Sequence, residues 1–387
     1  MLRFLTAGES HGPCLTAIVE GCPAGFPIDI DAVNVDMRRR MMGHGRGGRM
    51  KIEQDTAELR SGVRFGETLG SPITLVVENR DWKNWLKKMS ARPEDRDARV
   101  PVTRPRPGHA DLAGVLKYGH DDVRNVLERA SARETAARVA IGGIAKCLLR
   151  PFGIAVRGWV AEIGDVVANH AGLDPEAIFA AAEVSAVRVA DPEAERKIVA
   201  AIDDCKKRGD TLGGIVEVVA TGLPPGLGSH VHWDRKLDGR LAHALMSIQA
   251  VKGVEIGLGF ATARRPGSIV HDEIYFDAAR NQFVRRTNMA GGTEGGMTSG
   301  APLVVRAAFK PIATLMKPLH SVDIATKAEA KSAIERSDVC AIPAAAVIAE
   351  AVVAFVVADA FLEKFGGDSL REVRRNYEGY LQQIAQF

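Results

Sequence analysis

The stretch from Thr103 to Arg138 constrains the fold most, because two Arg-Pro pairs stand near its start. Each proline fixes its own φ angle and pushes the arginine before it toward extended backbone. A helix is therefore excluded over residues 104–107, and two guanidinium groups stand on a stiff loop. Gly108 lets the backbone turn or approach a ligand closely, and His109 follows it directly.

The end of this stretch leads into a predicted helix. Arg129, Ser131 and Arg133 precede an apolar-periodic run over residues 134–149, which predicts a buried helix. Cations and small hydroxyl groups at the start of a helix, beside a stiff loop with a histidine, are typical of a pocket for an anionic ligand. The alternative is a solvated arginine loop with a structural histidine, and this stretch alone does not decide between the two.

The composition is that of an ordinary soluble globular protein, with 387 residues, 46% hydrophobic and 26% charged. A formal charge of +3, with the two signs interspersed, argues against a nucleic-acid binder. Five cysteines without a CxxC pair argue against a disulfide framework or a metal site. The N-terminus lacks an apolar signal core, and the longest apolar run is interrupted by Pro343, Glu350 and Asp359. We therefore expect a cytoplasmic protein without a membrane span.

A glycine-flanked turn is predicted near the N-terminus. Residues 8–12 place Glu, Ser and His between two glycines, after a short apolar start and before a predicted strand at Leu15–Glu20. A plain hairpin turn is the alternative. Even so, the adjacent Ser10 and His11 would both be well placed to face a ligand.

A cationic glycine loop follows a predicted helix at Asp31–Met42, for which Asp29 or Asp31 is the expected N-cap. Residues 43–48 match G-x-G-x-x-G, but a helix precedes them and a strand is predicted at Met50–Gln54. The dinucleotide fingerprint needs the opposite order, so we reject a Rossmann fold. The loop still suits phosphate or carboxylate binding, because it carries forked, always-charged donors. A solvated charged loop remains an equal alternative. Its cations of interest are Arg40, Arg46 and Arg49.

The rest of the chain mixes strands and helices without a short repeat or a linker, which favours a single α/β domain over residues 1–387. Strands are predicted over residues 62–78, 154–163, 213–220, 254–257 and 303–309. Helices are predicted over residues 173–208, 236–245, 325–334, 343–365 and 369–386. An exposed excursion at Asn79–Asp97, with Trp82 and Trp85, is expected to cover another part of the protein. The glycine-rich segment 288–300 would let backbone amides wrap a ligand.

Six short motifs, in their order and approximate spacing, resemble the chorismate synthase family. They stand at residues 8–12, 106–111, 131–135, 291–300, 310–314 and 336–340. The resemblance implies conversion of 5-enolpyruvylshikimate-3-phosphate to chorismate and phosphate by anti-1,4 elimination, with reduced FMN required although no net redox change occurs. It also implies an α+β fold, with helices sandwiched between two antiparallel-rich sheets, an internal duplication and assembly as a homotetramer.

The resemblance also implies roles for individual residues. His109 would protonate the reduced flavin, and His11 would donate a proton or a hydrogen bond to the departing phosphate. Asp338 would assist removal of the C6 proton through flavin N5, and Ser10 and Ser131 would support proton positioning. The neutral pKa range of histidine suits both imidazole roles.

Ligand contacts are implied in the same way. The expected substrate contacts are Arg40, Arg46, Arg49, Arg106 and Arg133. NADPH is expected at Arg40 and Arg46. The expected FMN contacts are Arg129, Ala130, Ser131, Gln249, Ala250, Gly295, Lys310, Pro311, Ile312, Ala313, Thr314 and Arg336. Ala130 departs from the family pattern, because many relatives have serine there, so a hydroxyl contact to the flavin is lost or unneeded.

Two other classes of function compete with this interpretation. The literal G-x-G-x-x-G favours a nicotinamide-dependent oxidoreductase, and the cations between Arg38 and Lys51 favour a nucleic-acid binder. The sequence leaves open whether the protein reduces its flavin with NADPH or depends on a separate flavin reductase.

Overall fold

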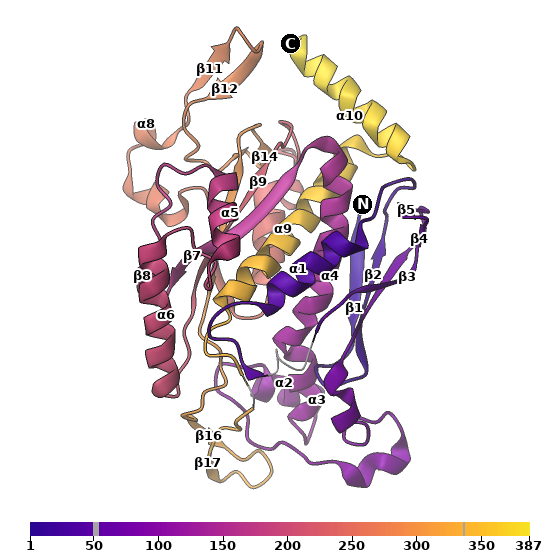
Figure 1. Ribbon diagram of the computed structural model, residues 1–387, viewed down its shortest axis with the longest axis vertical. Helices are drawn as coiled ribbons and strands as arrows, with labels where there is room; N and C mark the ends of the chain where they lie inside the picture. Colours follow the sequence, from indigo (N-terminus) through magenta and orange to yellow (C-terminus); the bar gives the residue numbers. More distant parts are fainter. Residues whose placement is uncertain (49–53, 336) are drawn as a thin grey trace.

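The computed structural model describes residues 1–48, 54–335 and 337–387, and its two larger sheets are antiparallel (Figure 1). The first sheet has the order β1 (Arg3–Ala7), β2 (Cys14–Glu20), β6 (Ile73–Glu78) and β3 (Glu58–Ser61). The second has the order β10 (Val251–Ile256), β15 (Leu303–Phe309), β9 (Gly214–Thr221), β7 (Ala155–Ile163) and β8 (Val166–Val167). The predicted strands at 154–163, 213–220 and 303–309 are confirmed.

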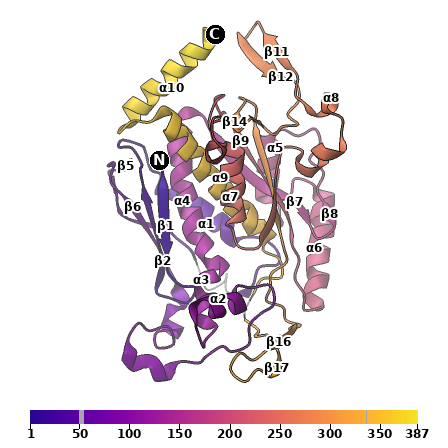
Figure 2. The same ribbon diagram turned by 180° about the vertical axis from the view of Figure 1, so that it is seen from behind.

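Two long helices, α4 (Thr135–Leu149) and α9 (Ile342–Phe365), lie between these sheets, and α1 (Ile30–Met41) packs on both (Figures 1 and 2). Helix α4 contacts the first sheet, and α9 contacts β7 and β9 of the second. A Cβ on Gly142 would lie 2.3 Å from the Cβ of Ala351, so the helix backbones approach closely where these small residues meet. The mixed helix and sheet class is confirmed.

Helix α9 is apolar on nearly all sides, which is the pattern of a helix surrounded by protein. Its length and composition would suffice to cross a membrane, but 83% of its most apolar window is buried inside the protein. The helix begins with Pro343 in its first turn, where a missing N–H leaves no bond unmade.

Strand burial follows the two-residue period of a pleated sheet. In β15, Leu303, Val305 and Ala307 are buried while the residues between them are partly exposed. Val305 pairs with Val218 of β9, so the apolar faces of neighbouring strands coincide. This register directs one face of the second sheet toward α9.

Side-chain caps define the ends of several helices. The Asp29 carboxylate accepts the N–H of Ala32 at 3.0 Å, which confirms Asp29 as the N-cap of α1. In α10 (Leu370–Ala385), Ser369 and Glu372 form a reciprocal capping box. The predicted helix over 369–386 is confirmed.

Smaller elements surround this layered core. Helices α5 (Pro175–Val184) and α6 (Pro192–Lys207) divide the region 173–208, while α7 (Leu237–Met246) packs against α9. At one end of the molecule, α10 projects beside the hairpin of β11 (Ile274–Asp277) and β12 (Gln282–Arg285) (Figure 2). Near the opposite end lie α2 (Asp111–Tyr118), α3 (Arg124–Ala130) and the hairpin of β16 (His320–Val322) and β17 (Glu329–Lys331).

Short elements complete the described structure. The two-stranded pairs are β4 (Val63–Arg64) with β5 (Glu67–Thr68) and β13 (Thr293–Glu294) with β14 (Met297–Thr298). The remaining α-helix is α8 (Gly267–Val270). Short stretches of 3-10 helix occur at Arg80–Asn84, Pro93–Ala98, Ala132–Glu134, Arg150–Phe152, Trp233–Arg235 and Gly259–Arg264.

The helix predicted over residues 325–334 is wrong. This segment forms the turn and second strand of the β16–β17 hairpin. The Asp323 carboxylate accepts the backbone N–H groups of Ala325 and Thr326, and Lys327 has a φ of +64°, so a turn replaces the helix. The strand predicted at Met50–Gln54 lies mostly outside the described residues.

Candidate active site

The N-terminal turn joins β1 to β2, as the sequence predicts. Gly8 has a φ of +105°, and a Cβ there would lie 2.3 Å from the carbonyl oxygen of Cys14, so glycine is required. The Asn79 amide, at the end of β6, donates to the carbonyl oxygens of Gly12 and Glu9 at 2.7 and 3.2 Å. The turn is thus fixed from the neighbouring strand, with Ser10 buried inside it.

The His11 ring is held by Glu128 of α3. Its Nδ1 lies 2.9 and 3.0 Å from the two carboxylate oxygens of Glu128, and Arg124 donates to the same carboxylate at 2.8 Å. Burial opposes the charge on Glu128, but these hydrogen bonds outweigh it and its pKa lies below the ordinary value. Trp85 stacks on the imidazole, with ring centroids 4.0 Å apart.

His109 is held by a carboxylate two residues further along. Its Nδ1 lies 2.5 Å from Asp111 Oδ1 and 3.1 Å from Arg106 Nη2. Arg106 also donates to Asp111 through Nε at 2.8 Å and to the Thr314 hydroxyl at 2.9 Å. Burial would raise the pKa of Asp111, but hydrogen bonds from His109 and Arg106 hold it well below its usual range. The stiff arginine loop therefore does carry an ordered histidine.

Two buried arginines share one carboxylate beside the N-terminus of α4. Arg40 and Arg133 donate to Asp55 at 3.2 and 2.6 Å, and Arg133 also donates to Asn79 at 2.9 Å. Burial lowers the pKa of Arg40 to about 10, against the attraction of Asp55, and its guanidinium stays charged at neutral pH. Two forked, permanently charged donors that meet at one carboxylate suit the phosphate or carboxylate of an anionic ligand.

The last turn of α1 is fixed by a separate buried ion cluster. Arg39 donates to Glu350 of α9 at 2.8 and 3.0 Å, and Lys146 of α4 pairs with the same carboxylate. Burial opposes the charge on Glu350, but Lys146 and Arg39 lower its pKa to about 2. Arg39 thereby anchors the helix that presents Arg40 to the candidate site.

Asp338 pairs with Arg46 of the glycine loop. The distance from Asp338 Oδ2 to Arg46 Nη1 is 2.6 Å, and the Gly47 N–H donates to Oδ1 at 2.6 Å. Asp338 does not cap α9, whose N-cap is Ala341 and has no side-chain cap bond. The glycine loop is therefore tied to the segment before α9.

Several predicted flavin contacts converge near the His109 loop. The Lys310 N–H donates to the Ala250 carbonyl at 3.0 Å, and the Lys310 ammonium group donates to the Gly108 carbonyl. Burial, together with Lys252, lowers the pKa of Lys310. Gln249 Oε1 is buried and has no hydrogen-bond partner among the described residues. Ala250 has a φ of +72°, a conformation that non-glycine residues rarely adopt and that clusters at functional sites.

The start of α4 supplies a second group of predicted flavin contacts. Arg129 donates to neutral oxygens of Thr6 and Gly8 at 2.7–3.3 Å, so in the described part of the chain no carboxylate neutralises it. Ser131 Oγ lies 3.3 Å from Ser10 Oγ and accepts the N–H of Arg133. A cation, an unsatisfied amide oxygen and accessible hydroxyls fit a phosphate-bearing, hydrogen-bonding cofactor.

The structure brings most predicted site residues together, but not all. Residues 333–335 contact both histidine-bearing regions, because Glu335 pairs with Arg124 at 3.4 Å and Ala333 donates to the Arg104 carbonyl at 3.3 Å. Gly295 lies in the β13–β14 hairpin, where the nearest side-chain atom to an added Cβ belongs to His230. No described contact joins it to the histidine loops. Arg49 and Arg336 lie outside the described residues.

Sequence reasoning missed the carboxylates that organise this site. Asp111 stood inside the 106–111 motif, two residues after a candidate catalytic histidine, and that spacing was an available signal. Asp55 and Glu128 carried no comparable signal, because Arg133 and His11, which they hold, are 78 and 117 residues away.

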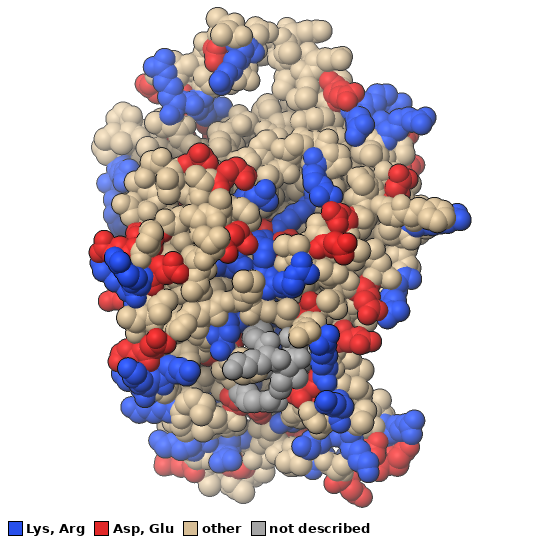
Figure 3. Space-filling view, viewed as in Figure 1, with Lys and Arg blue, Asp and Glu red and all other residues tan. Residues whose placement is uncertain are grey.

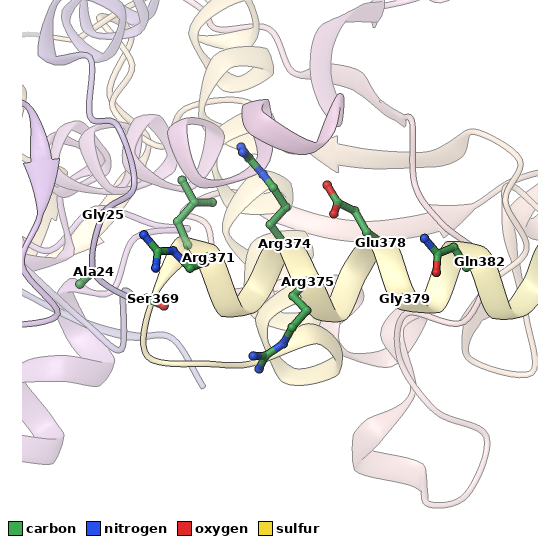
Figure 4. Close-up of a pocket in the computed structure, with 10 residues that line it drawn as sticks. Ala24, Gly25, Ser369, Arg371, Arg374, Arg375, Glu378, Gly379 and Gln382 are labelled. Carbon is green, nitrogen blue, oxygen red and sulfur yellow. The ribbon is translucent and has the colours of Figure 1, made fainter.

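One cavity lies away from these residues. About 950 Å³ in volume, it is lined by the start of α10 and by Ala24 and Gly25. Arg371, Arg374 and Glu378 line it from one helix (Figure 4). None of the predicted site residues lines this cavity. Surface charge is no better guide, since acidic and basic side chains are interspersed on the face in Figure 3.

Two carboxylate-held histidines beside buried arginines define an acid–base enzyme for a multiply anionic substrate. A family model described as chorismate synthase matches residues 2–362. The chain belongs to the chorismate synthase family, and its members are carbon–oxygen lyases. The reaction of this family is the 1,4 elimination of phosphate from 5-enolpyruvylshikimate-3-phosphate, which yields chorismate.

Relatives match along the whole chain. A chorismate synthase of Geobacter metallireducens is 61% identical over 393 residues and is covered completely, as is this chain. One from Symbiobacterium thermophilum is 64% identical over 390 residues, covering 99% of this chain and 100% of the relative. A crystal structure of chorismate synthase matches with a TM-score of 0.81 and 45% identity, covering 100% of this chain and 99% of the other.

Proposed function

We propose that the N-terminal turn, the start of α4 and the 104–109 loop together bind the polyanionic substrate 5-enolpyruvylshikimate-3-phosphate. The observation that carries this is the sharing of one buried carboxylate, Asp55, by two buried arginines. Forked, permanently charged donors suit phosphate and carboxylate groups. The substrate contacts would be Arg40, Arg46, Arg49, Arg106 and Arg133.

The acid–base roles follow from the two held histidines. His11 would give a proton or a hydrogen bond to the departing phosphate. Ser10 and Ser131 would support the positioning of that proton. His109 would hold the proton that the flavin side of the site needs, with Asp111 compensating the imidazolium charge. Asp338 would assist removal of the C6 proton while it fixes Arg46.

We propose that FMN lies between the start of α4 and the 310–314 segment. Reduced FMN would supply the redox-active ring that this elimination needs despite having no net redox change. The chain would hold it through Arg129, Ala130, Ser131, Gln249, Ala250, the segment Lys310–Thr314 and Arg336. The unsatisfied Gln249 Oε1 and the uncompensated Arg129 support this placement. Gly295, in the β13–β14 hairpin, would be a further contact to the flavin.

The reductant of the flavin, the assembly and the domain organisation are proposed on the same basis. NADPH would use Arg40 and Arg46, so it would compete with substrate, and a separate flavin reductase is the alternative source of electrons. The protein would be a cytoplasmic homotetramer, an assembly that the exposed Phe276 and Phe283 of the β11–β12 hairpin support. Residues 1–387 would form one domain with an internal duplication, in which α4 and α9 each cover one sheet.

An anaerobic turnover assay with photoreduced FMN tests the proposed function. We expect many chorismate molecules for each reduced flavin, and no activity with oxidised FMN. One oxidised flavin per product would show a stoichiometric redox reaction and would refute the proposal. Measuring NADPH consumption in parallel separates it from a nicotinamide-dependent oxidoreductase.

A further inference from the structure

We propose that Glu128 and Trp85 are positioning residues for His11. Glu128 fixes which ring nitrogen carries the hydrogen, and Trp85 fixes the plane of the ring. This inference rests on the proposed role of His11 in transferring a proton to the departing phosphate. It adds two residues to the site that lie far from His11 in the sequence.

The hydrogen bonds around Glu128 determine the tautomer. Its carboxylate accepts the His11 backbone N–H at 2.8 Å and the Arg124 Nη1–H at 2.8 Å, and it lies within 3.0 Å of His11 Nδ1. An ionised carboxylate only accepts, so Nδ1 carries the hydrogen. In the neutral ring, Nε2 is then the acceptor, which is the nitrogen able to take up and return a proton.

Glu128 also fixes the position of the turn. Its backbone carbonyl accepts the Ser10 N–H at 3.0 Å, so one residue of α3 holds two successive residues of the turn. The Glu128 side chain is only 2% exposed and that of His11 12% exposed. Because so little solvent reaches these side chains to screen their charges, the carboxylate would stabilise the imidazolium that forms when His11 holds a second ring proton.

Trp85 comes from the 79–97 segment, for which a covering role was predicted. The planes of its ring and the His11 ring differ by 28°, with centroids 4.0 Å apart. The indole N–H donates to buried Asp81 at 3.2 Å, and Asn84 donates to the same carboxylate at 2.7 Å. The indole is therefore held at its edge, and its face restricts rotation of the imidazole.

A Glu128→Gln variant distinguishes a carboxylate that sets the tautomer of His11 from one that only holds the turn in place. The amide has one accepting oxygen and one donating nitrogen, whereas all the neighbours named above present hydrogens. If the amide nitrogen faces Nδ1, the hydrogen moves to Nε2 and the neutral ring can no longer accept a proton there. Turnover then falls although the turn remains folded.

The test is a double-mutant cycle in anaerobic single turnovers with reduced FMN and saturating 5-enolpyruvylshikimate-3-phosphate. Glu128→Gln should lower the rate constant by about tenfold or more, while equilibrium titration should show a nearly unchanged affinity for the substrate. In a His11→Ala background the same change should add almost nothing, because Glu128 acts through His11. Glu335→Gln is the matched control, since Glu335 also pairs with Arg124 but does not contact His11, and it should keep the wild-type rate.

The outcomes separate the two ideas. A His11→Ala rate near wild type would overturn the role of His11 itself. A slow His11→Ala variant beside a fast Glu128→Gln variant, or multiplying losses in the double variant, would overturn positioning by Glu128 alone. Should Glu128→Gln fail to fold, Trp85 provides the test. Trp85→Phe should keep most of the rate and Trp85→Ala should lose it, and equal rates for both would refute the proposal.

Discussion

His11 and His109 are both held through Nδ1, but the neighbours of the two nitrogens differ. Nδ1 of His11 faces the two oxygens of Glu128. Nδ1 of His109 lies between an oxygen of Asp111 at 2.5 Å and Arg106 Nη2 at 3.1 Å. Because a guanidinium only donates, the two neighbours of His109 favour opposite tautomers. His11 therefore has one strongly favoured tautomer, whereas His109 depends on the balance between a carboxylate and a cation.

The supports of the two rings also differ in their origin. His109 is held by neighbours in its own loop, and Lys310 and Thr314 fasten that loop to the segment that follows β15. His11 is held by α3 and by Trp85, which belong to separate parts of the chain. The difference teaches that His109 is ordered by a local, stiff backbone, while His11 needs the assembled fold.

The largest expected effects come from replacing each of the two histidines. His109→Ala should lower kcat by about 10²–10⁴-fold and leave the affinities for FMN and substrate nearly intact. His11→Ala should lower kcat by a similar factor and also weaken substrate binding, because His11, unlike His109, would contact the substrate phosphate. Anaerobic kinetics and equilibrium titration measure both. Identical binding losses in the two variants would contradict the assignment of separate roles.

Removing the carboxylate that holds His109 should affect stability as well as rate. Asp111→Asn leaves Arg106 buried without its counter-charge, and breaking such a pair costs about 3–5 kcal/mol. Chemical denaturation of the variant and the wild type gives the difference. A loss below about 1 kcal/mol would place Arg106 in a more solvated site than the structure indicates.

The contribution of the same carboxylate to the stability of the wild type should depend on pH. Because the pKa of folded Asp111 is depressed, its contribution to stability is present above the unfolded value of about 3.9 and is lost as pH falls from there toward the folded value. We expect the stability gap between wild type and Asp111→Asn to narrow below about pH 4. Denaturation midpoints at pH 7 and pH 3 check this, and a gap independent of pH would contradict the linkage.

The smallest effects sharpen the contrast between the two arginines. Arg106 is buried and donates to Asp111, Thr314 and His109, so Arg106→Lys should cost about 1.5–3 kcal/mol of stability. Arg124 is more exposed and makes one short bond to Glu128, so Arg124→Lys should cost less than about 1 kcal/mol. Thermal or chemical unfolding compares the two. A larger loss at Arg124 would reverse the account of which loop depends on its cation.

The sequence predicts those parts of the fold that depend on local pattern. The alternation of β15, the cap at Asp29 and the apolar run of α9 each follow from neighbouring residues. The segment 325–334 was mispredicted because its helical composition is overridden by the turn that Asp323 fastens. Strand order and the packing of α4 on α9 depend on contacts far apart in sequence, which periodicity does not encode.

The same distinction applies to the site. Motif resemblance supplied both histidines, and the structure adds the carboxylates that hold them. Asp111 is two residues from His109, so its role was accessible to local reasoning. Glu128 meets His11 only after α3 folds against the N-terminal turn, and Asp55 meets Arg133 only after the first sheet packs on α4.

The most direct test of the central claim is the structure of the protein crystallised with oxidised FMN and 5-enolpyruvylshikimate-3-phosphate. The account predicts the substrate phosphate at a hydrogen-bond distance of about 2.6–3.2 Å from His11 Nε2, with the flavin ring beside His109. Substrate bound in the cavity beside α10, or a phosphate out of reach of His11, would contradict it.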